Sequence, residues 1–440
     1  MPNGFRPALL LAAAVALPCA ADPAPPSHPD DLAALRSQGP AGLRTLLKQY
    51  DATPPGPGRD ALALDVDKVA GQRYATVSRL YWYTELAPAV AEAQREHRPI
   101  LELRMLGRLD EDLSCANSRL FRATLYANAE VSTLLRNDFV LLWTTERPVP
   151  KVTIDFGDGR KIVRTTTGNS AHYILDENGA VLDVLPGLYA PSAFRTELQS
   201  SLAFAHSLRG KTGDALAQAI TAYHTQLAAR TQKQFSTIAN APYIAATHHL
   251  STAAELEDAI ARAQRATMSK AMIEVRDLKH IGLYPGALPD DAPYWAAVGQ
   301  RLYNIGDVAA FHESATPRQA ARQAATKASA PPTVLDARSR ALIAQLHDEV
   351  PAELVATPEQ LADVIARLEQ HLVADSALDQ LQLRPQISQF IASHHGRIDF
   401  ETLNSWVYAT VFNTPASDPW LGLMPRTDFS GLPGDGIESF

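Results

Sequence analysis

Cysteine is almost absent from this chain, and its scarcity restricts the covalent chemistry that is possible. The 440 residues contain two cysteines, Cys19 and Cys115. If Cys19 leaves with an N-terminal leader, Cys115 is the single thiol of the mature protein. A chain with one thiol forms no intramolecular disulfide, so its fold depends on the packing of its core. Such a cysteine is either buried and inert or kept for a reaction.

Clusters of positive charge are missing as well. The formal net charge is -8, and no run of five or more Lys or Arg occurs. This balance argues against a surface for nucleic acid or for an anionic membrane. The apolar content of 46% and the charged content of 20% are typical of a globular chain of roughly two to three domains. We therefore expect proteins or small molecules as partners and no nucleic acid.

Several motifs of known chemistry do not occur. The sequence has no G-x-S-x-G, no H-E-x-x-H, no Walker loop and no G-x-G-x-x-G, so hydrolase, zinc-protease and nucleotide-binding functions lack support. We expect no cofactor. The pairs His248-His249 and His394-His395 do not suggest a metal site, because adjacent helical residues point about 100° apart. The segment around Asp158 and Gly159 predicts a hairpin turn and not a calcium loop.

The longest apolar run is short and stands at the N-terminus. Arg6 precedes the run Ala8 to Leu17, and the small residues Ala20 and Ala21 follow it. This pattern predicts a signal peptide over residues 1–21 and a periplasmic or secreted protein with no integral membrane segment after cleavage. A lipid anchor at Cys19 is the alternative, which Pro18 disfavours.

The first part of the chain predicts a tether, a short helix and then a mixed α/β region. Residues 22–79 begin Pro-rich, and a helix is expected over residues 32–50, followed by a loose segment over 51–58. Within residues 80–207, the pattern predicts a helix over 86–97, a half-buried strand over 100–106, a helix from about 115 and a central strand over 138–145 that is buried on both faces. Hairpins at 152–165 and 171–185 and a helix from Pro191 complete this region.

Residues 208–440 are predicted to be mostly helical. Thr252 and Thr357 each begin a capping box, and the residues after Thr357 trace one apolar helix face. An Ala/Ser/Pro/Gln-rich stretch predicts a loop at 313–332. The aromatic and apolar tail from Trp406 is expected to pack back onto the body.

Cys115 is predicted to stand at the start of a helix, where a thiol is readily ionised. Unpaired backbone N–H groups and the helix dipole lower the pKa of such a thiol from about 8.5 to roughly 3.5–7.5. Ser118, one turn later, either donates a hydrogen bond to the sulfur or bonds to the backbone. The acidic residues 110–112 oppose ionisation, and Arg119 and Arg122 favour it. The sequence leaves the sign of the net pKa shift open.

The order of elements around Cys115 resembles the thioredoxin-like superfamily. The resemblance covers about residues 80–207 and is closest to secreted thioredoxin-domain proteins. It is carried by Arg98-Pro99 before the first strand, the Asn-Asp-Phe-Val strand from Asn137, and the Leu-Asp-x-x-Gly hairpin from Leu175. Cys115 takes the place of the first cysteine of a C-x-x-C pair, and Ser118 takes the place of the second. The fold class expected is thus an α/β thioredoxin-like domain followed by a mainly α-helical C-terminal region.

The resemblance implies a thiol–disulfide exchange protein with a monothiol C-x-x-S site. Cys115 would be the nucleophile and Ser118 its supporting donor, and the partners would be protein thiols or disulfides. With one thiol, isomerisation, client capture and redox sensing remain. Ser170 stands where the family has a cis-proline, and because a cis peptide without proline costs about 3 kcal/mol, a trans loop of another shape is expected. The residues implied for the substrate groove are Asn117, Asn169, Ser170 and His172.

Two further functions remain open at this point. The chain could be a non-catalytic scaffold that keeps the fold and binds another envelope protein through its helical region. It could also handle a metal through Cys115 and His172, which would require their side chains to meet. By strand alternation, Glu102 and Arg104 are predicted to be paired charges on an outer surface.

Overall fold

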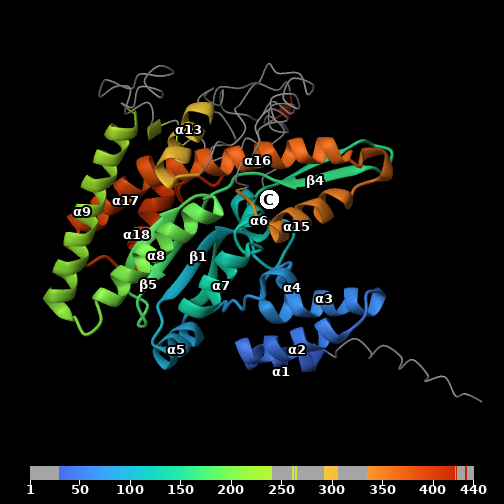
Figure 1. Cartoon of the computed structure of the whole chain (residues 1–440), viewed down its shortest axis with the longest axis horizontal. Coiled ribbons are helices and arrows are strands. Elements are labelled where there is room, and N and C mark those ends of the chain that lie inside the picture. Colours follow the sequence, from blue (N-terminus) through green and yellow to red (C-terminus); the bar gives the residue numbers. More distant parts are fainter. Residues whose placement is uncertain are drawn as a thin grey trace, which may run out of the picture.

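A single four-stranded sheet organises the central part of the molecule (Figure 1). Its strand order is β2-β1-β5-β6. Strand β1 (Ile100–Leu106) is parallel to β2 (Val140–Arg147) and antiparallel to β5 (Ser170–Leu175), which pairs antiparallel with β6 (Val181–Pro186). The computed structural model describes residues 29–239, 260, 261, 263, 264, 292–305, 334–421, 423, 432 and 433.

Strand β2 is an edge strand, so its prediction as a central strand is wrong. Its apolar first half is nevertheless buried, because helices such as α5 (Leu86–Glu96) and α7 (Ala129–Asp138) pack against it. An extended segment also lies along its outer edge. Tyr83 donates its N–H to Leu141 O at 2.8 Å and accepts from Trp143 N at 3.0 Å. A continuous apolar run predicts that both faces of a strand are buried, but it does not predict how many strands lie beside it. Here a short backbone bridge, and not a full strand, covers the outer edge of β2.

Helices cover both faces of the sheet. The ring of His172 on β5 lies against Phe121 of α6 (Ala116–Thr124) and Phe194 of α8 (Pro191–Ser207). The next residue, Tyr173, points to the opposite face, where its ring meets Phe400 of α18 (Phe400–Trp406). The crossover from β1 to β2 also contains α7 (Ala129–Asp138), and α5 (Leu86–Glu96), which precedes β1, agrees with the helix predicted over 86–97.

The N-terminal residues form a small helical unit with its own core. The helix predicted over 32–50 is broken, because Gly39 adopts a φ of 63° between α1 and α2. The segment predicted to be loose continues into a third helix, which begins at Pro57. Leu46, Val66 and Val69 lie in the common core of this unit. Figure 1 shows the unit on one side of the sheet. Its helices are α1 (Pro29–Ser37), α2 (Pro40–Ala52), α3 (Pro57–Ala70) and α4 (Ala75–Ser78).

The described part of residues 208–440 is helical, as predicted. Thr357 forms the expected capping box with Gln360, and the tail packs back, because Val407 and Phe412 are fully buried. Two short stretches, η3 and η4, are π-helical, a rare conformation that is frequent at functional sites. The elements are α9 (Gly213–Ala239), α13 (Ala292–Tyr303), α15 (Ala337–Asp348), η2 (Ala352–Leu354), α16 (Pro358–Leu378), η3 (Asp379–Leu383), α17 (Arg384–Ser393), α18 and η4 (Val407–Val411).

A separate two-stranded hairpin is formed by the residues that lie between β2 and β5 in the sequence. It consists of β3 (Lys151–Asp155) and β4 (Lys161–Thr165), joined by the predicted Asp-Gly turn. In Figure 1 this hairpin extends away from the main sheet. The second predicted hairpin, β5–β6, turns at Asn178-Gly179, where the Asp176 carboxylate accepts from the N–H groups of Asn178 and Ala180, both at 2.8 Å.

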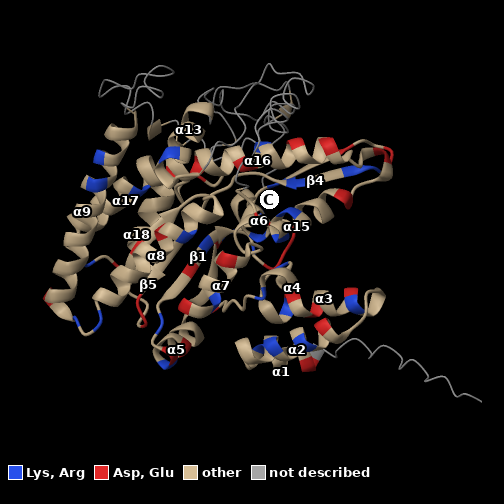
Figure 2. Ribbon diagram, viewed as in Figure 1, with Lys and Arg blue, Asp and Glu red and all other residues tan. Residues whose placement is uncertain are grey.

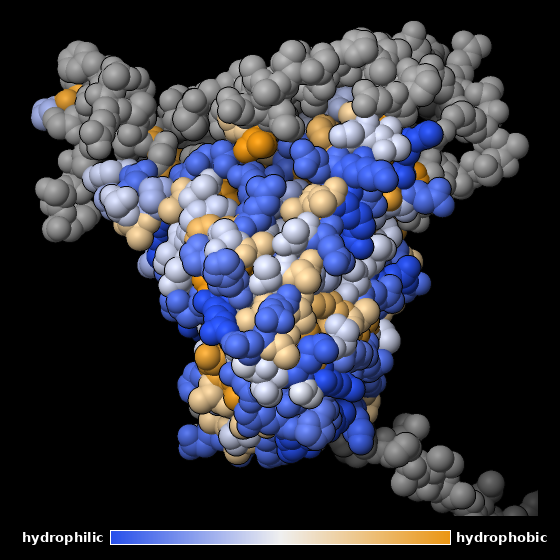
Figure 3. Space-filling model, turned by 90° about the vertical axis from the view of Figure 1, so that its left-hand side faces the viewer, coloured by the Kyte–Doolittle hydropathy of each residue, from blue (hydrophilic) through white to orange (hydrophobic). Residues whose placement is uncertain are grey.

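The mixed α/β region and the helical C-terminal part are therefore both present. Among the described residues, none of the helices combines the length and apolar character that a bilayer crossing requires. Hydrophilic residues dominate the face drawn in Figure 3. Several predicted features lie outside the described residues: the signal peptide at 1–21, the Pro-rich tether, the capping box at Thr252, His248-His249 and the loop at 313–332.

Candidate functional site

Cys115 is held at the C-terminal end of β1 by the turn that leads into α6. Its backbone N–H donates to Leu106 O at 3.1 Å, so the residue lies directly beside the end of the strand. The turn begins at Gly107, whose φ is +74° and whose added Cβ would lie 3.0 Å from Val149 Cγ1. Cys115 is the N-cap of α6, as the sequence predicts.

The sulfur contacts the first turn of its own helix. The Cys115 thiol donates to Ser118 Oγ at 3.3 Å, and Ser118 N–H donates to Sγ at 3.5 Å. The Ser118 hydroxyl donates to the Cys115 carbonyl at 2.9 Å and lies 2.8 Å from Ser114 Oγ. Cys115 and Ser118 are both 0% exposed. The sulfur is thus capped by an amide as expected, but it has no surface.

Burial decides the sign of the pKa shift that the sequence left open. Burial raises the pKa of the Cys115 thiol, and the hydrogen bonds from Ser118 and the charge of Arg119 only partly oppose this. Arg122 supports the preceding turn instead, because its guanidinium donates to Leu109 O at 3.1 Å and to Asp112 O at 3.2 Å. The folded protein therefore keeps the Cys115 thiol protonated at neutral pH.

The loop before β5 closes over the same end of α6. Ala116 N–H donates to Thr167 O at 3.4 Å, and Thr165 Oγ1 donates to Ser114 O at 2.6 Å. None of the described residues has a cis peptide, so the bond before Ser170 is trans, as expected without proline. Ser170 pairs with Met105, and its buried side chain lies on the α6 side of the sheet.

His172 and Cys115 make their hydrogen bonds to different partners. The Tyr126 hydroxyl lies 2.8 Å from His172 Nε2. Complete burial lowers the pKa of His172 to about 3, so the ring is neutral. No group of three or more His, Cys, Asp or Glu side chains that could hold a metal occurs in the described ranges. His172 therefore bonds to Tyr126, and no hydrogen bond joins it to Cys115.

The residues predicted for a substrate groove are buried. Asn117, Asn169, Ser170 and His172 are all 0% exposed. Both amide atoms of Asn117, together with Asn169 Oδ1 and Ser170 Oγ, have no hydrogen-bond partner within the described part of the chain. Ser170 and Asn169 lie at the end of the sheet where Cys115 is located, which we call the thiol end. Neither residue is exposed to solvent.

The C-terminal segment, the residues around Tyr408 and Thr414, covers the thiol end. The sequence analysis did not predict that this segment lies near Cys115. Asn169 Nδ2 donates to Thr414 Oγ1 at 3.0 Å, and the Tyr408 hydroxyl lies 3.5 Å from Asn169 O. Arg147, at the end of β2, donates to Thr414 O at 2.6 Å. The only signal in the sequence is the apolar tail, which predicts packing but not its location.

The prediction of Glu102 and Arg104 as paired surface charges is wrong. Glu102 is 3% exposed under α18, and it accepts from Thr144 Oγ1 at 2.5 Å. Arg104 pairs instead with Glu146 at 2.9 Å, and Asn404 of α18 also donates to Glu146 at 2.8 Å. Burial raises the pKa of Glu102 to about 6, although the bond from Thr144 and the charge of Arg104 lower it. Alternation placed these side chains on one face correctly, but the face is covered by helices distant in sequence.

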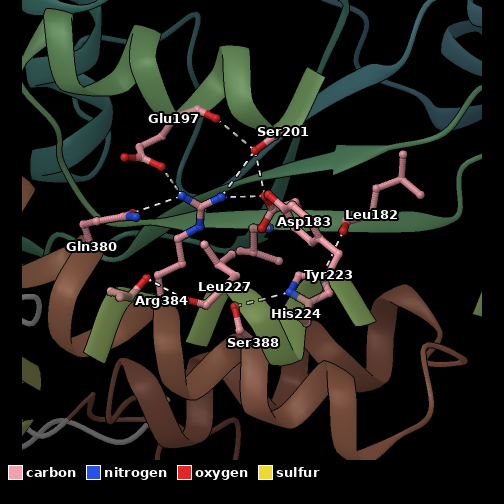
Figure 4. Close-up of polar contacts among 12 residues, drawn as sticks. Leu182, Asp183, Glu197, Ser201, Tyr223, His224, Leu227, Gln380, Arg384 and Ser388 are labelled. Atoms are coloured by element: carbon pink, nitrogen blue, oxygen red, sulfur yellow. Dashed lines mark hydrogen bonds and ion pairs between the residues drawn. The ribbon is translucent and has the colours of Figure 1, made fainter. Parts of the chain in front are cut away.

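A buried arginine joins the helical region to the sheet (Figure 4). Arg384 of α17 forms ion pairs with Asp183 of β6 at 2.5 Å and Glu197 of α8 at 2.6 Å. Ser201 and Tyr223 donate to the same Asp183 oxygen at 2.7 and 2.9 Å. The sequence analysis missed this cluster, although an aspartate within the apolar run of β6 was a signal for a buried partner.

Neither the comparison with protein-family models nor the comparison with curated proteins finds a match for this chain.

Proposed function

We propose that this chain is an exported thioredoxin-like scaffold that binds another envelope protein, and that Cys115 serves its core and not thiol–disulfide exchange. The observation that carries the proposal is the complete burial of the Cys115 sulfur. The attacking species in disulfide exchange is a thiolate that reaches the substrate sulfur. Here burial raises the thiol pKa, and no face of the sulfur meets solvent.

The thioredoxin-like assignment is supported by topology. The parallel β1–α6–α7–β2 unit is followed by the antiparallel β5–β6 pair and by α8, and the strand order is β2-β1-β5-β6. A cysteine at the N-cap of the helix that follows β1, beside the end of that strand, adds to this support. The leader-like residues 1–21 support export.

The scaffold assignment is supported by the way in which the helical region is attached. Thr414 and Tyr408 contact Asn169 over the thiol end, where the substrate of a redox-active thioredoxin would approach. The cluster of Arg384, Asp183 and Glu197 fixes the same region to β6 and α8. A region anchored by buried ion pairs is a permanent part of the fold, and we propose that it carries the surface that binds the partner.

Thiol–disulfide exchange is the second candidate, and one observation favours it. Ser118 N–H approaches the sulfur at 3.5 Å, and the charge of Arg119 also lowers the thiol pKa. These interactions would stabilise a thiolate in a form of the protein in which the C-terminal segment has moved away.

Alkylation of the folded chain separates the two candidates. We expect iodoacetamide to leave Cys115 unmodified in the native protein at about pH 8 and to modify it fully in guanidinium chloride. The Cys115→Ser variant should keep the biological role, which is the binding of another envelope protein. Truncation after about residue 210 should abolish this binding. Rapid native labelling, together with loss of the role in Cys115→Ser, would replace the scaffold proposal by thiol exchange.

A further inference from the structure

The hairpin β3–β4 has an open edge. It forms a two-stranded sheet of its own, and among the described residues no strand pairs with the outer edge of β3. Phe156, Ile162 and Val163 on this hairpin are 51%, 39% and 43% exposed. A two-stranded hairpin is marginally stable alone, and an unprotected edge is a template for another strand.

Backbone geometry identifies which residues of β3 offer hydrogen bonds outward. Phe156 N–H donates to Arg160 O at 3.2 Å, and Thr166 N–H donates to Pro150 O at 3.1 Å. Hydrogen-bonded pairs alternate with non-hydrogen-bonded pairs along an antiparallel ladder. In the register that pairs Thr153 with Val163, Val152 and Ile154 therefore bond to β4. The N–H and C=O groups of Lys151, Thr153 and Asp155 point away from β4.

These three residues are arranged to pair with themselves. The strand reads Lys151-Val-Thr-Ile-Asp155, and an antiparallel second copy centred on Thr153 places each Lys151 opposite an Asp155. The residues that meet are those whose backbone groups point outward, so the pairing also satisfies the ladder. Opposite charges and Thr–Thr pairs facing each other across strands are both favourable.

We propose that this chain self-associates through β3, which pairs antiparallel with β3 of a second copy across a twofold axis at Thr153. The result is a continuous four-stranded sheet in the order β4-β3-β3-β4, an isologous contact. Strand β4 lacks this property, because centring it on Val163 sets Lys161 against Thr165 and Ile162 against Arg164. Figure 2 shows the basic positions along β4. An interface of five residues per copy belongs to the small, weak class, so the dimer depends on protein concentration.

Cysteine cross-linking tests the axis. In a hydrogen-bonded antiparallel pair the two Cα atoms lie about 5.5 Å apart, within the range of a disulfide. Under a mild oxidant, Thr153→Cys should give a covalent dimer. The matched control is Val163→Cys, because Val163 pairs with Thr153, shares its face of the hairpin and lies one strand further from the axis. The native Cys115 is buried and adds no background.

Charge reversal tests the register. Lys151→Glu creates like-charged pairs across the axis and should weaken the dimer roughly tenfold. Because Asp155 also pairs with Lys161 within the hairpin at 2.9 Å, the variant that adds Asp155→Lys and Lys161→Asp to Lys151→Glu keeps both pairings and should restore the dimer. Sedimentation velocity across a dilution series of the full chain measures the association, and circular dichroism checks the fold of each variant. A monomer at every concentration overturns the proposal. Equal cross-linking of the two cysteine variants, or pairing of this edge with a strand of a different protein only, also overturns it.

Discussion

The Arg384 guanidinium and the Asp183 carboxylate form an ion pair in which Nη2 and Oδ2 lie 2.5 Å apart and each side chain is 1% exposed. Burial raises the pKa of Asp183, but the charges of Arg384 and His224, together with the hydrogen bonds from Ser201 and Arg384, outweigh this and hold the pKa below its usual value. The two residues are far apart in sequence, and they join the first residue of α17 to the middle of β6. The attachment of the helical region to the sheet therefore depends on a pair that cannot be broken without leaving a buried charge.

Replacing Arg384 by Met should destabilise the protein strongly. Because Asp183 would keep its burial and lose its cation, the free energy of unfolding should fall by about 3–5 kcal/mol. Denaturation in urea measures this. The control is Arg397→Met, which removes an ion pair to Asp214 whose side chains are 61% and 81% exposed, and it should cost less than about 1 kcal/mol. Equal losses in the two variants would contradict the structural role of the pair.

Glu102 should make stability depend on pH. Its pKa rises from 4.5 in the unfolded chain to about 6 in the folded protein, so the folded state binds the proton more tightly. The stability that this group contributes is full below about pH 4.5 and is lost as the pH rises through about 6, a difference of about 2 kcal/mol.

The Glu102→Gln variant isolates this effect. At about pH 8 it should be more stable than the unmodified chain by about 2 kcal/mol, and at about pH 4 the two should be equal. Urea unfolding at both pH values provides the comparison. The control is Glu401→Gln, which changes a carboxyl beside Arg104 that is 69% exposed. Its effect on the free energy of unfolding should be small at both pH values. A constant gap for Glu102→Gln would show that burial does not perturb this carboxyl.

Gly187→Ala should disturb the contact between the β6–α8 loop and η3. Gly187 has a φ of +76°, and an added Cβ would lie 2.2 Å from Asp379 Oδ2, which accepts from Leu188 N at 2.7 Å. We expect a loss of more than about 2 kcal/mol, from the left-handed backbone together with the clash. Gly157→Ala carries a similar φ of +75° with nothing within 4 Å, so it reports the backbone cost alone. Thermal unfolding of both variants should separate the two contributions.

Thr414→Val should loosen the cover over the thiol end. The substitution leaves Asn169 Nδ2 without its acceptor at a fully buried position, at a cost of about 1–3 kcal/mol. Native alkylation of Cys115 should then become measurable. Ser376→Ala is the control, because it removes a buried bond from Ala190 N at 2.7 Å and leaves Asn169 untouched. If both variants label at the same rate, labelling follows global unfolding and the segment is not a local cover.

Local patterns in the sequence were sufficient for most individual elements. The alternation over 100–106, the Asp-Gly and Asn-Gly turns and the capping box at Thr357 each predicted a strand, a hairpin or a helix start that the structure contains. These features depend on side chains and backbone groups within a few residues of each other, so no distant contact is needed to decide them. The position of Cys115 at a helix N-cap belongs to the same class.

Tertiary structure alone decided whether that cysteine meets solvent. Asn169 and Glu102 are covered by segments that follow them by more than two hundred residues, Thr414 and α18, and the residues on either side of Cys115 are covered by the loop before β5, about fifty residues later. Sequence periodicity states which face of a strand a side chain occupies, but it does not state what covers that face. Desolvation acts through this cover, so the pKa of a thiol or carboxyl follows from the assembled fold and not from its local sequence.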